Sequence, residues 1–240
     1  LIIIIWICLG GVSRRVDCLD HGFVRLVNVA GLSIPADTVD IANAARISFD
    51  NFDAGRSREQ DLKLCEYLIK NKHTSPWEMI EIWLEMKLPI FVARQFVRHR
   101  TCSINEVSAR YSTLPAEWYV PETVGGKSAS NKQGQEDNLG EEVQQAFKDN
   151  LNLMCTQSFH HYKLALENGI APEHARLFLH VNHYTHWLWK QDLHNLMHFL
   201  SLRLHEHAQV EARVYAQAVY DLLQQALPEA MELFDQYRRL

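Results

Sequence analysis

Arginine, histidine and serine side chains concentrate between residues 98 and 110 of this chain. Arg98, His99 and Arg100 open the stretch, and Ser108 and Arg110 close it. The chain as a whole has a formal net charge of -5, so the cationic character is local. Guanidinium groups, hydroxyls and backbone N–H groups are the usual donors to phosphate. The stretch therefore predicts a site for a small anionic ligand, and a pI near 6.2 argues against nucleic acid as a partner.

The order of residues in this stretch is more specific than its charge. Residues 98–110 follow the pattern Arg-His-Arg-x-x-Ser-x-Asn-Glu-x-Ser-x-Arg. This pattern resembles the signature of the flavin-dependent thymidylate synthases, the ThyX family. Residues 44–49 (AARISF) and 73–78 (HTSPWE) resemble two further segments of that family, although Met79 stands where histidine is frequent. The resemblance extends from about residue 21 to residue 220.

The resemblance implies reductive methylation of dUMP to dTMP. Methylenetetrahydrofolate would give the carbon, and FAD reduced by NADPH would carry the hydride. The residues that would bind dUMP are Gln95, Arg98, Glu106, Val107, Ser108, Ala109, Arg110, Arg176 and Arg203. The family is a homotetramer whose active sites combine residues from several subunits, so we expect the same assembly here.

Among these residues, the resemblance gives Arg203 the catalytic role. A cation fixed beside N3 of the uracil ring favours the deprotonated base and directs electron density toward C5. The sequence alone leaves a second interpretation open, a surface ion pair between Arg203 and Glu206. Gln95 and Arg98 share a helix face. An amide and a guanidinium there would suit the base edge and the phosphate of a nucleotide, and a solvated helix end is the alternative interpretation. Ser108 is expected to bind and not to attack, because no neighbouring base is evident to activate it.

The flavin site implied by the resemblance draws on distant segments. Its residues would be Ser75, Arg98, His99, Arg100, Glu106, Asp192, His194 and His198. Asp192, His194 and His198 stand where some members of the family carry asparagine and arginine. The chain has no Gly-x-Gly-x-x-Gly fingerprint, so FAD would not be bound as in a dinucleotide-binding βαβ fold.

Two other functions stay open. One is a flavin-dependent paralogue that acts on another pyrimidine nucleotide or with another one-carbon donor. The other is a metal-binding helical protein, because the chain has 13 histidines and His194 and His198 have the spacing of zinc ligands. No glutamate lies between these two histidines as in an HExxH site, and we therefore expect no metal.

The cysteines and the N-terminal segment bear on the compartment. There are 5 cysteines and no Cys-x-x-Cys pair, which indicates a reducing, cytoplasmic environment and no disulfide framework. Residues 1–9 are apolar, but a membrane-spanning helix needs about 20 such residues. We expect residues 1–20 to be an extension outside the catalytic fold; an edge strand is the alternative, and no membrane partner is expected.

The elements around these residues indicate an α+β fold, with a mostly antiparallel sheet flanked by long helices in a single domain over residues 21–240. Strands are expected over residues 23–30, 80–86 and 181–189. Helices are expected over residues 37–47, 57–71, 90–97, 141–168, 172–179 and 207–226, after Asp192 and after Pro228. Residues 98–113 lack a period and predict a loop, and the polar residues 124–140 predict an exposed, mobile insertion.

Two apolar sets are expected to pack. An amphipathic stripe on the helix over 141–168 is formed by Val143, Phe147, Leu151, Met154 and Ala165. The aromatic residues Tyr184, Trp187, Trp189 and Phe199 are interpreted as core and not as a platform for stacking bases.

Overall fold

A five-stranded antiparallel sheet forms the centre of the protein. The structure is a computed structural model that describes residues 14–52, 55–128, 134–136 and 139–239. The strand order is β1-β2-β3-β7-β4. The strands are β1 (Arg15–Cys18), β2 (Gly22–Ala30), β3 (Glu81–Pro89), β7 (Tyr184–Asp192) and β4 (Ser103–Glu106). The predicted α+β class with an antiparallel sheet is confirmed.

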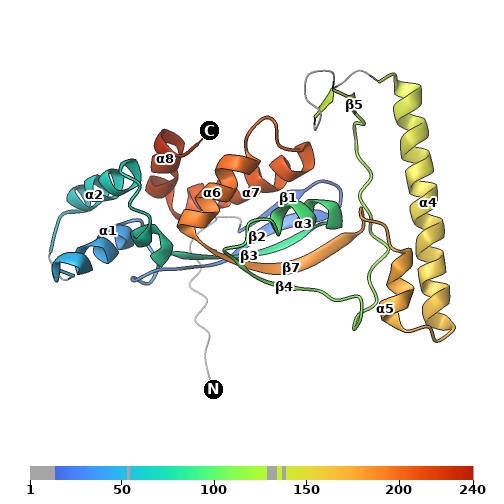
Figure 1. Ribbon diagram of the computed structural model, residues 1–240, viewed down its shortest axis with the longest axis horizontal. Coiled ribbons are helices and arrows are strands. Elements are labelled where there is room, and N and C mark those ends of the chain that lie inside the picture. The colour runs from blue at the N-terminus through green and yellow to red at the C-terminus, as the bar shows by residue number, and fades with distance from the viewer. Residues whose placement is uncertain (1–13, 53–54, 129–133, 137–138, 240) are drawn as a thin grey trace.

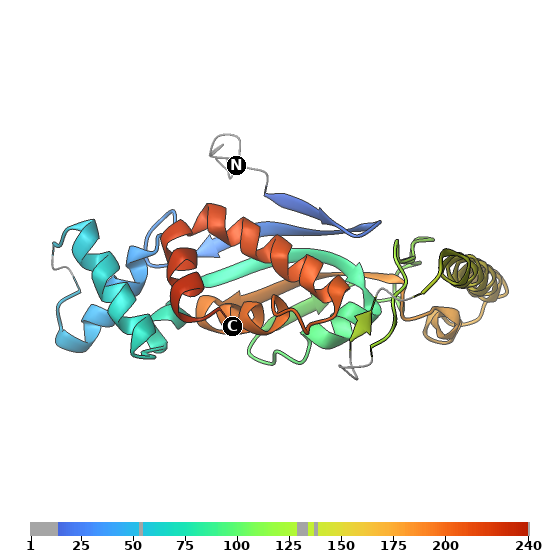
Figure 2. The ribbon, with the colours of Figure 1, turned by 90° about the horizontal axis from the view of Figure 1, so that it is seen from above.

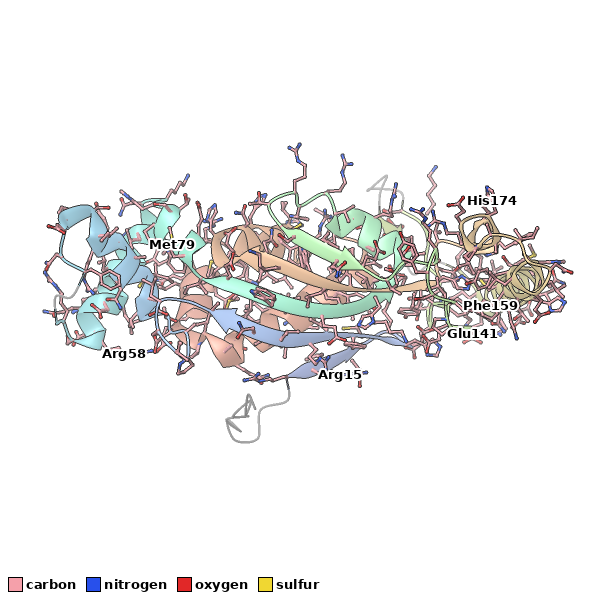
Figure 3. All side chains as sticks on the ribbon, turned by 90° about the horizontal axis from the view of Figure 1, so that it is seen from below. Arg15, Arg58, Met79, Glu141, Phe159 and His174 are labelled. Carbon is pink, nitrogen blue, oxygen red and sulfur yellow. The ribbon has the colours of Figure 1, made fainter. Side chains whose placement is uncertain are left out.

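Helices cover one face of this sheet and extend beyond both of its ends (Figures 1 and 2). Four helices lie on the covered face: α3 (Ile90–Phe96), α6 (Leu193–Arg203), α7 (Val210–Ala226) and α8 (Pro228–Tyr237). At one end lie α1 (Val39–Arg46), α2 (Arg58–Lys70) and the 3-10 helices η1 (Ile47–Phe49) and η2 (Ser75–Met79). At the other end lie α4 (Glu141–Glu167), α5 (Pro172–Ala175) and the 3-10 helix η3 (Arg176–Phe178). Met79 of η2 and His174 of α5 mark these two opposite ends in Figure 3.

Local sequence explains where the elements that carry the site begin and end. In β3, buried Ile82, Leu84 and Met86 alternate with half-buried neighbours, as the period of two predicts. Pro89 ends this strand and precedes α3, because it fixes φ and has no N–H to donate. The Asp192 side chain accepts a hydrogen bond from the Asn195 N–H and caps α6, which confirms the predicted start of that helix.

The four aromatic residues interpreted as core are all buried, and the Trp189 ring of β7 lies 5.0 Å from the Phe199 ring of α6, centroid to centroid. Trp187 and Trp189 are 2% and 1% exposed, and Phe199 is fully buried. The Phe96 ring from α3 lies 4.8 Å from Phe199 and 6.0 Å from Trp189, centroid to centroid. These ring contacts fix the end of α3 against α6, and the residues that follow α3 start the arginine-rich stretch.

The predicted loop over residues 98–113 is wrong for its middle part. Ser103–Glu106 forms β4, which pairs with Trp187–Lys190 of β7 at the sheet edge. All four β4 residues are exposed, so the strand shows no alternation of apolar and polar residues by which the sequence could reveal it.

Three further expectations change. Arg15–Cys18 pairs with β2 as an edge strand, so this part of the expected extension lies in the sheet, and residues 1–13 lie outside the described residues. Within 124–140, Gly126–Lys127 and Gln135–Glu136 pair as the small sheet β5–β6, and the expected mobility stays a prediction. On α4, the stripe is largely exposed, with Phe147 at 48% and Met154 at 53%.

Within the described ranges, no helix has the length and apolar character needed to cross a membrane.

Candidate active site

Arg203, at the end of α6, is bound to the end of α3. Its Nε donates to His99 Nε2 at 3.2 Å, and its Nη2 donates to the backbone oxygen of Gln95 at 3.3 Å. Among the described residues no ion pair joins Arg203 to Glu206, so the surface-pair interpretation is wrong. We call Gln95, His99, His198 and Arg203 the Arg203 cluster; the His99 and His198 rings lie 6.2 Å apart.

His99 is the acceptor that orients the Arg203 guanidinium. The His99 side chain is buried, at 9% exposure. Burial, followed by the Arg203 charge and His198, lowers the pKa of His99 to about 4. The ring is therefore neutral near pH 7, with Nε2 free to accept from Arg203 and the proton on Nδ1. A protonated His99 would instead repel the guanidinium.

The Gln95 side chain is oriented by a residue that the sequence analysis missed. Its amide Nε2 lies 2.5 Å from Gln209 Oε1, just before α7. This bond assigns the amide of Gln95 as a donor toward Gln209 and leaves its Oε1 as an acceptor for a ligand. Gln209 lies 114 residues further along the chain, and no local pattern links the two.

The end of β4 and the following turn form a second group, which we call the Arg110 cluster: Glu106, Ser108, Arg110 and Glu173. Thr185 Oγ1 of β7 donates to Glu106 Oε1. The Arg110 N–H faces Ser108 Oγ at 3.3 Å, and Arg110 Nε lies 3.6 Å from Glu173 Oε2 of α5. Arg176, exposed in η3, follows Glu173 by three residues.

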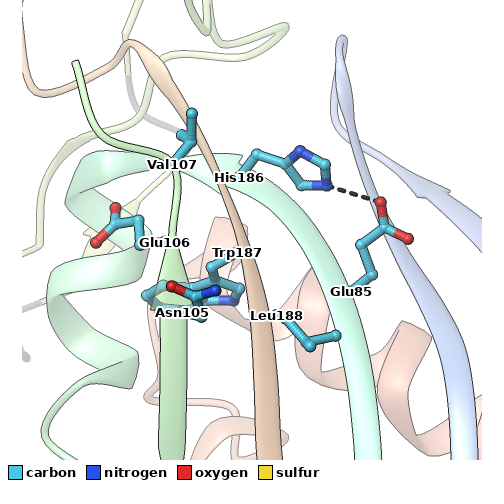
Figure 4. Close-up of a pocket in the computed structure, with 7 residues that line it drawn as sticks. All are labelled: Glu85, Asn105, Glu106, Val107, His186, Trp187 and Leu188. Carbon is cyan, nitrogen blue, oxygen red and sulfur yellow. Dashed lines mark hydrogen bonds and ion pairs between the residues drawn. The ribbon is translucent and has the colours of Figure 1, made fainter. Parts of the chain in front are cut away.

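A shallow hollow of about 350 Å³ adjoins the Arg110 cluster (Figure 4). It is lined by Glu85, Asn105, Glu106, Val107, His186, Trp187 and Leu188. His186 Nε2 lies 2.8 Å from Glu85 Oε1 across it. A second hollow, of about 390 Å³, is lined by Val97, Arg98 and Arg100. Among the described residues neither of these two arginines makes an ion pair, so both guanidinium groups are available to an anion.

The first turn of α6 forms a third group, the His194 cluster: Asp192, His194 and Arg238. Arg238 Nη1 lies 3.3 Å from His194 Nδ1. Burial and then Arg238 lower the pKa of His194, while Asp192 and Glu78 of η2 oppose that shift. Ser75 belongs to η2, which packs against α6. Arg238 could not be predicted from the sequence, because nothing in the spacing connects it with a histidine 44 residues earlier.

The Arg110 cluster is separate from the other two within one chain, whereas His194 and His198 lie one turn apart on α6 and link the His194 and Arg203 clusters. Among the described residues, no hydrogen bond or ion pair joins Arg203 to Arg110 or Arg176. α5 and η3 lie beside α4 at one end of the molecule, whereas α6 lies over the sheet (Figure 1). The structure therefore brings Gln95, His99 and Arg203 together and leaves Arg110 and Arg176 apart from them.

Comparisons with known proteins identify the family. Residues 31–229 match the family model described as thymidylate synthase complementing protein. The flavin-dependent thymidylate synthase of Wolbachia pipientis is 43% identical over 221 residues, covering 91% of this chain and 75% of that protein. That of Thermus thermophilus is 42% identical over 222 residues, covering 92% and 78%. This chain belongs to the flavin-dependent thymidylate synthase family. The predicted family is confirmed, and with it the assignment to flavin-dependent methyltransferases.

A solved structure agrees with this family assignment. The UMP/dUMP methylase PolB from Streptomyces cacaoi, bound with 5-Br dUMP, superposes with a TM-score of 0.81 at 29% identity, covering 94% of this chain and 99% of that one. The comparisons do not favour the metal-binding alternative, and the described residues hold no group of three or more His, Cys, Asp or Glu that could bind a metal ion.

Proposed function

We propose that this protein converts dUMP to dTMP, with methylenetetrahydrofolate as the carbon donor and FAD, reduced by NADPH, as the hydride carrier. The observation that carries the proposal is the placement of Arg203. Its guanidinium is half-buried and bound to a neutral His99 and to the Gln95 carbonyl, without a carboxylate partner among the described residues. Such a cation is preorganised for a negative charge that develops in a ligand.

In the proposed reaction Arg203 activates the pyrimidine. A guanidinium beside N3 stabilises the base when N3 is deprotonated, and the negative charge then delocalises toward C5, the carbon to be methylated. His99 keeps the guanidinium oriented by accepting from Nε, so the remaining N–H groups can face the ring. Gln95 Oε1, held by the Gln209 contact, is an acceptor for the base edge.

The phosphate and sugar of dUMP would be bound mainly by the other arginines and the β4 turn. Arg98 and Arg176 are exposed cations, and Arg110 lies next to the Ser108 hydroxyl. These groups, with the backbone N–H of Ala109, form the donor set that a phosphate requires. The Val107 N–H already donates to the His186 carbonyl oxygen at 2.8 Å, so Val107 would contact dUMP through its carbonyl oxygen or side chain. Glu106, in contact with Thr185, supplies an acceptor for a hydroxyl or an N–H group.

The residues proposed for FAD fit an anionic dinucleotide. Arg98 and Arg100 supply donors and positive charge, the rings of His99, His194 and His198 supply nitrogen atoms for hydrogen bonds, and Asp192, Ser75 and Glu106 supply acceptors or a hydroxyl. Arg238 adds a half-buried guanidinium with no carboxylate partner among the described residues, as expected beside an anionic ligand. When bound, the flavin would supply the hydride that reduces the transferred one-carbon group to a methyl.

A homotetramer with shared active sites would unite the Arg203 and Arg110 clusters. α4 and the segment after it expose large apolar side chains, among them Phe147, Met154, Leu177 (78%) and Val181 (65%). Exposed apolar surface of this kind marks a protein interface. We propose that α4 and η3 lie at a subunit contact, which brings Arg110 and Arg176 of one subunit to Arg203 of another. Cys18, Cys65, Cys102 and Cys155 are free thiols, which supports a cytoplasmic location.

The proposal is tested by cofactor content and by turnover. Purified protein is expected to be yellow, and NADPH is expected to bleach it without oxygen. Release of tritium from dUMP labelled at C5 should require FAD and methylenetetrahydrofolate. UMP in place of dUMP is the matched control, because the Streptomyces neighbour is a UMP/dUMP methylase. Protein that cannot be loaded with FAD, or that prefers UMP, would contradict the proposed reaction.

A further inference from the structure

Arg238, immediately after α8, is tied to both ends of α6. Its backbone N–H donates to Phe234 O at 2.8 Å, and Ser201 Oγ donates to its carbonyl oxygen at 3.0 Å. Its side chain reaches His194, where Nη1 lies 3.3 Å from Nδ1. Ser201 and His194 are seven residues apart, about 10 Å along a helix. The side chain of Arg238 therefore runs along α6 toward its first turn.

Within the part of the chain that the structure describes, no carboxylate compensates the charge of Arg238. Among the described residues it makes no ion pair, whereas the next residue, Arg239, pairs with Asp235 at 2.9 Å. Burial lowers the pKa of Arg238, because a cation loses hydration there without gaining a carboxylate. A desolvated cation is unfavourable on its own, and a bound anion offsets that cost.

The contact with Arg238 also settles the state of the His194 ring. A guanidinium can only donate, so Nδ1 of His194 is the acceptor and the ring proton is on Nε2. The other charged groups near the ring are Asp192, Glu78 and His198. The neutral ring thus has one donor, Nε2–H, available to a ligand, and a fixed positive charge behind it.

We infer that Arg238 is a positioning residue of the flavin site, which holds His194 in the tautomer that donates from Nε2 and supplies positive charge toward the anionic cofactor. This inference rests on the proposed function, in which His194 binds FAD. Arg238 acts through His194 and need not touch the cofactor. It extends the cofactor site from α6 to the end of α8.

The test compares the affinity for FAD of two neighbouring arginine variants, measured by quenching of flavin fluorescence. Arg238→Gln removes the charge and shortens the side chain, and Arg239→Gln is the matched control. We expect Arg238→Gln to weaken FAD binding about tenfold, the worth of one charge-assisted hydrogen bond. Arg239→Gln should stay within about twofold of wild type. Equal affinity in Arg238→Gln and wild type, or an equal loss in both variants, would overturn the inference.

A double-mutant cycle separates positioning from a general effect on folding. In a His194→Ala background, Arg238→Gln should weaken FAD binding by no more than about threefold, because the contact through His194 is gone and only the charge of Arg238 still acts on the cofactor. An additive tenfold loss there would overturn the role through His194. If Arg238→Gln does not fold, Arg238→Lys against Arg239→Lys decides: about threefold weaker binding supports the inference, and equal binding overturns it. Wild-type protein that binds no FAD would instead refute the proposed function.

Discussion

His183 should make this protein sensitive to acid, through a histidine outside the proposed site. It is 1% exposed, and its ring lies 6.0 Å from Phe159 and 5.7 Å from Trp118, centroid to centroid. Neither ring nitrogen has a hydrogen-bond partner among the described residues. Burial, followed by the nearby His180, lowers the pKa of His183 to about 4. The folded protein therefore resists protonating this ring.

The size of the effect follows from the difference between the two states. An unfolded histidine titrates near 6.5, so between about 6.5 and 4 the unfolded chain binds the proton and the folded chain does not. Stability then falls as the pH falls through this range. For one site with these two pKa values, the loss between pH 7.5 and pH 5 is about 2 kcal/mol, rising to about 3 kcal/mol at still lower pH.

The perturbation is His183→Phe, which keeps a ring of similar size and removes the titration. The free energy of unfolding is measured by urea at pH 7.5 and pH 5, at one protein concentration, for wild type and variant. We expect the variant to lose about 2 kcal/mol less than wild type over this pH interval. At pH 7.5 it should be at least as stable, because a buried polar ring without partners is replaced by an apolar one. The same loss in both proteins would refute the reasoning.

Three further predictions concern the site and the fold. Arg203→Ala should retain FAD and lower the rate of tritium release by about 10²- to 10³-fold, the cost of removing one preorganised donor to a developing charge; near wild-type turnover would contradict this. Gln209→Leu should raise KM for dUMP more than it lowers kcat, because the side-chain amide of Gln95 loses its hydrogen-bond partner. Unchanged steady-state kinetics would show that the Gln95–Gln209 hydrogen bond does not contribute to dUMP binding. Asp61→Asn should lower the free energy of unfolding by about 3 kcal/mol in urea melts, since Arg46, 7% exposed, is left without its buried carboxylate; a change below about 1 kcal/mol would argue against that pair.

Elements with a clear local signal could be predicted from the sequence. Three local patterns of the sequence appear in the structure: the period of two over residues 80–86, the capping box of Ser57 and Gln60 that begins α2, and the Asp192 cap of α6. Each depends on contacts within a few residues, which a sequence displays directly. β4 could not be found in this way, because its pairing with β7 joins residues about 84 apart and both of its faces are exposed.

The chemistry of the site was predictable only in part. The motif over residues 98–110 indicated the family, but not which of its residues lie together in one chain. Arg203 with His99 and Gln95, Gln95 with Gln209, and His194 with Arg238 are contacts between segments that lie far apart in the sequence. The exposed apolar residues of α4 show that an apolar stripe of helical period need not be buried within its own chain; in the proposed tetramer it would contact another subunit.

Activity of mixed oligomers tests most directly whether arginines from different subunits meet at one nucleotide. Arg203→Ala and Arg176→Ala are each expected to be inactive alone. When the two are unfolded and reassembled together in equal amounts, a site that takes one residue from each of two subunits is intact in about a quarter of random combinations. We therefore expect dTMP formation to recover toward a quarter of the wild-type rate. A mixture as inactive as its parents would contradict a shared site and place the two guanidinium groups in the same subunit's site.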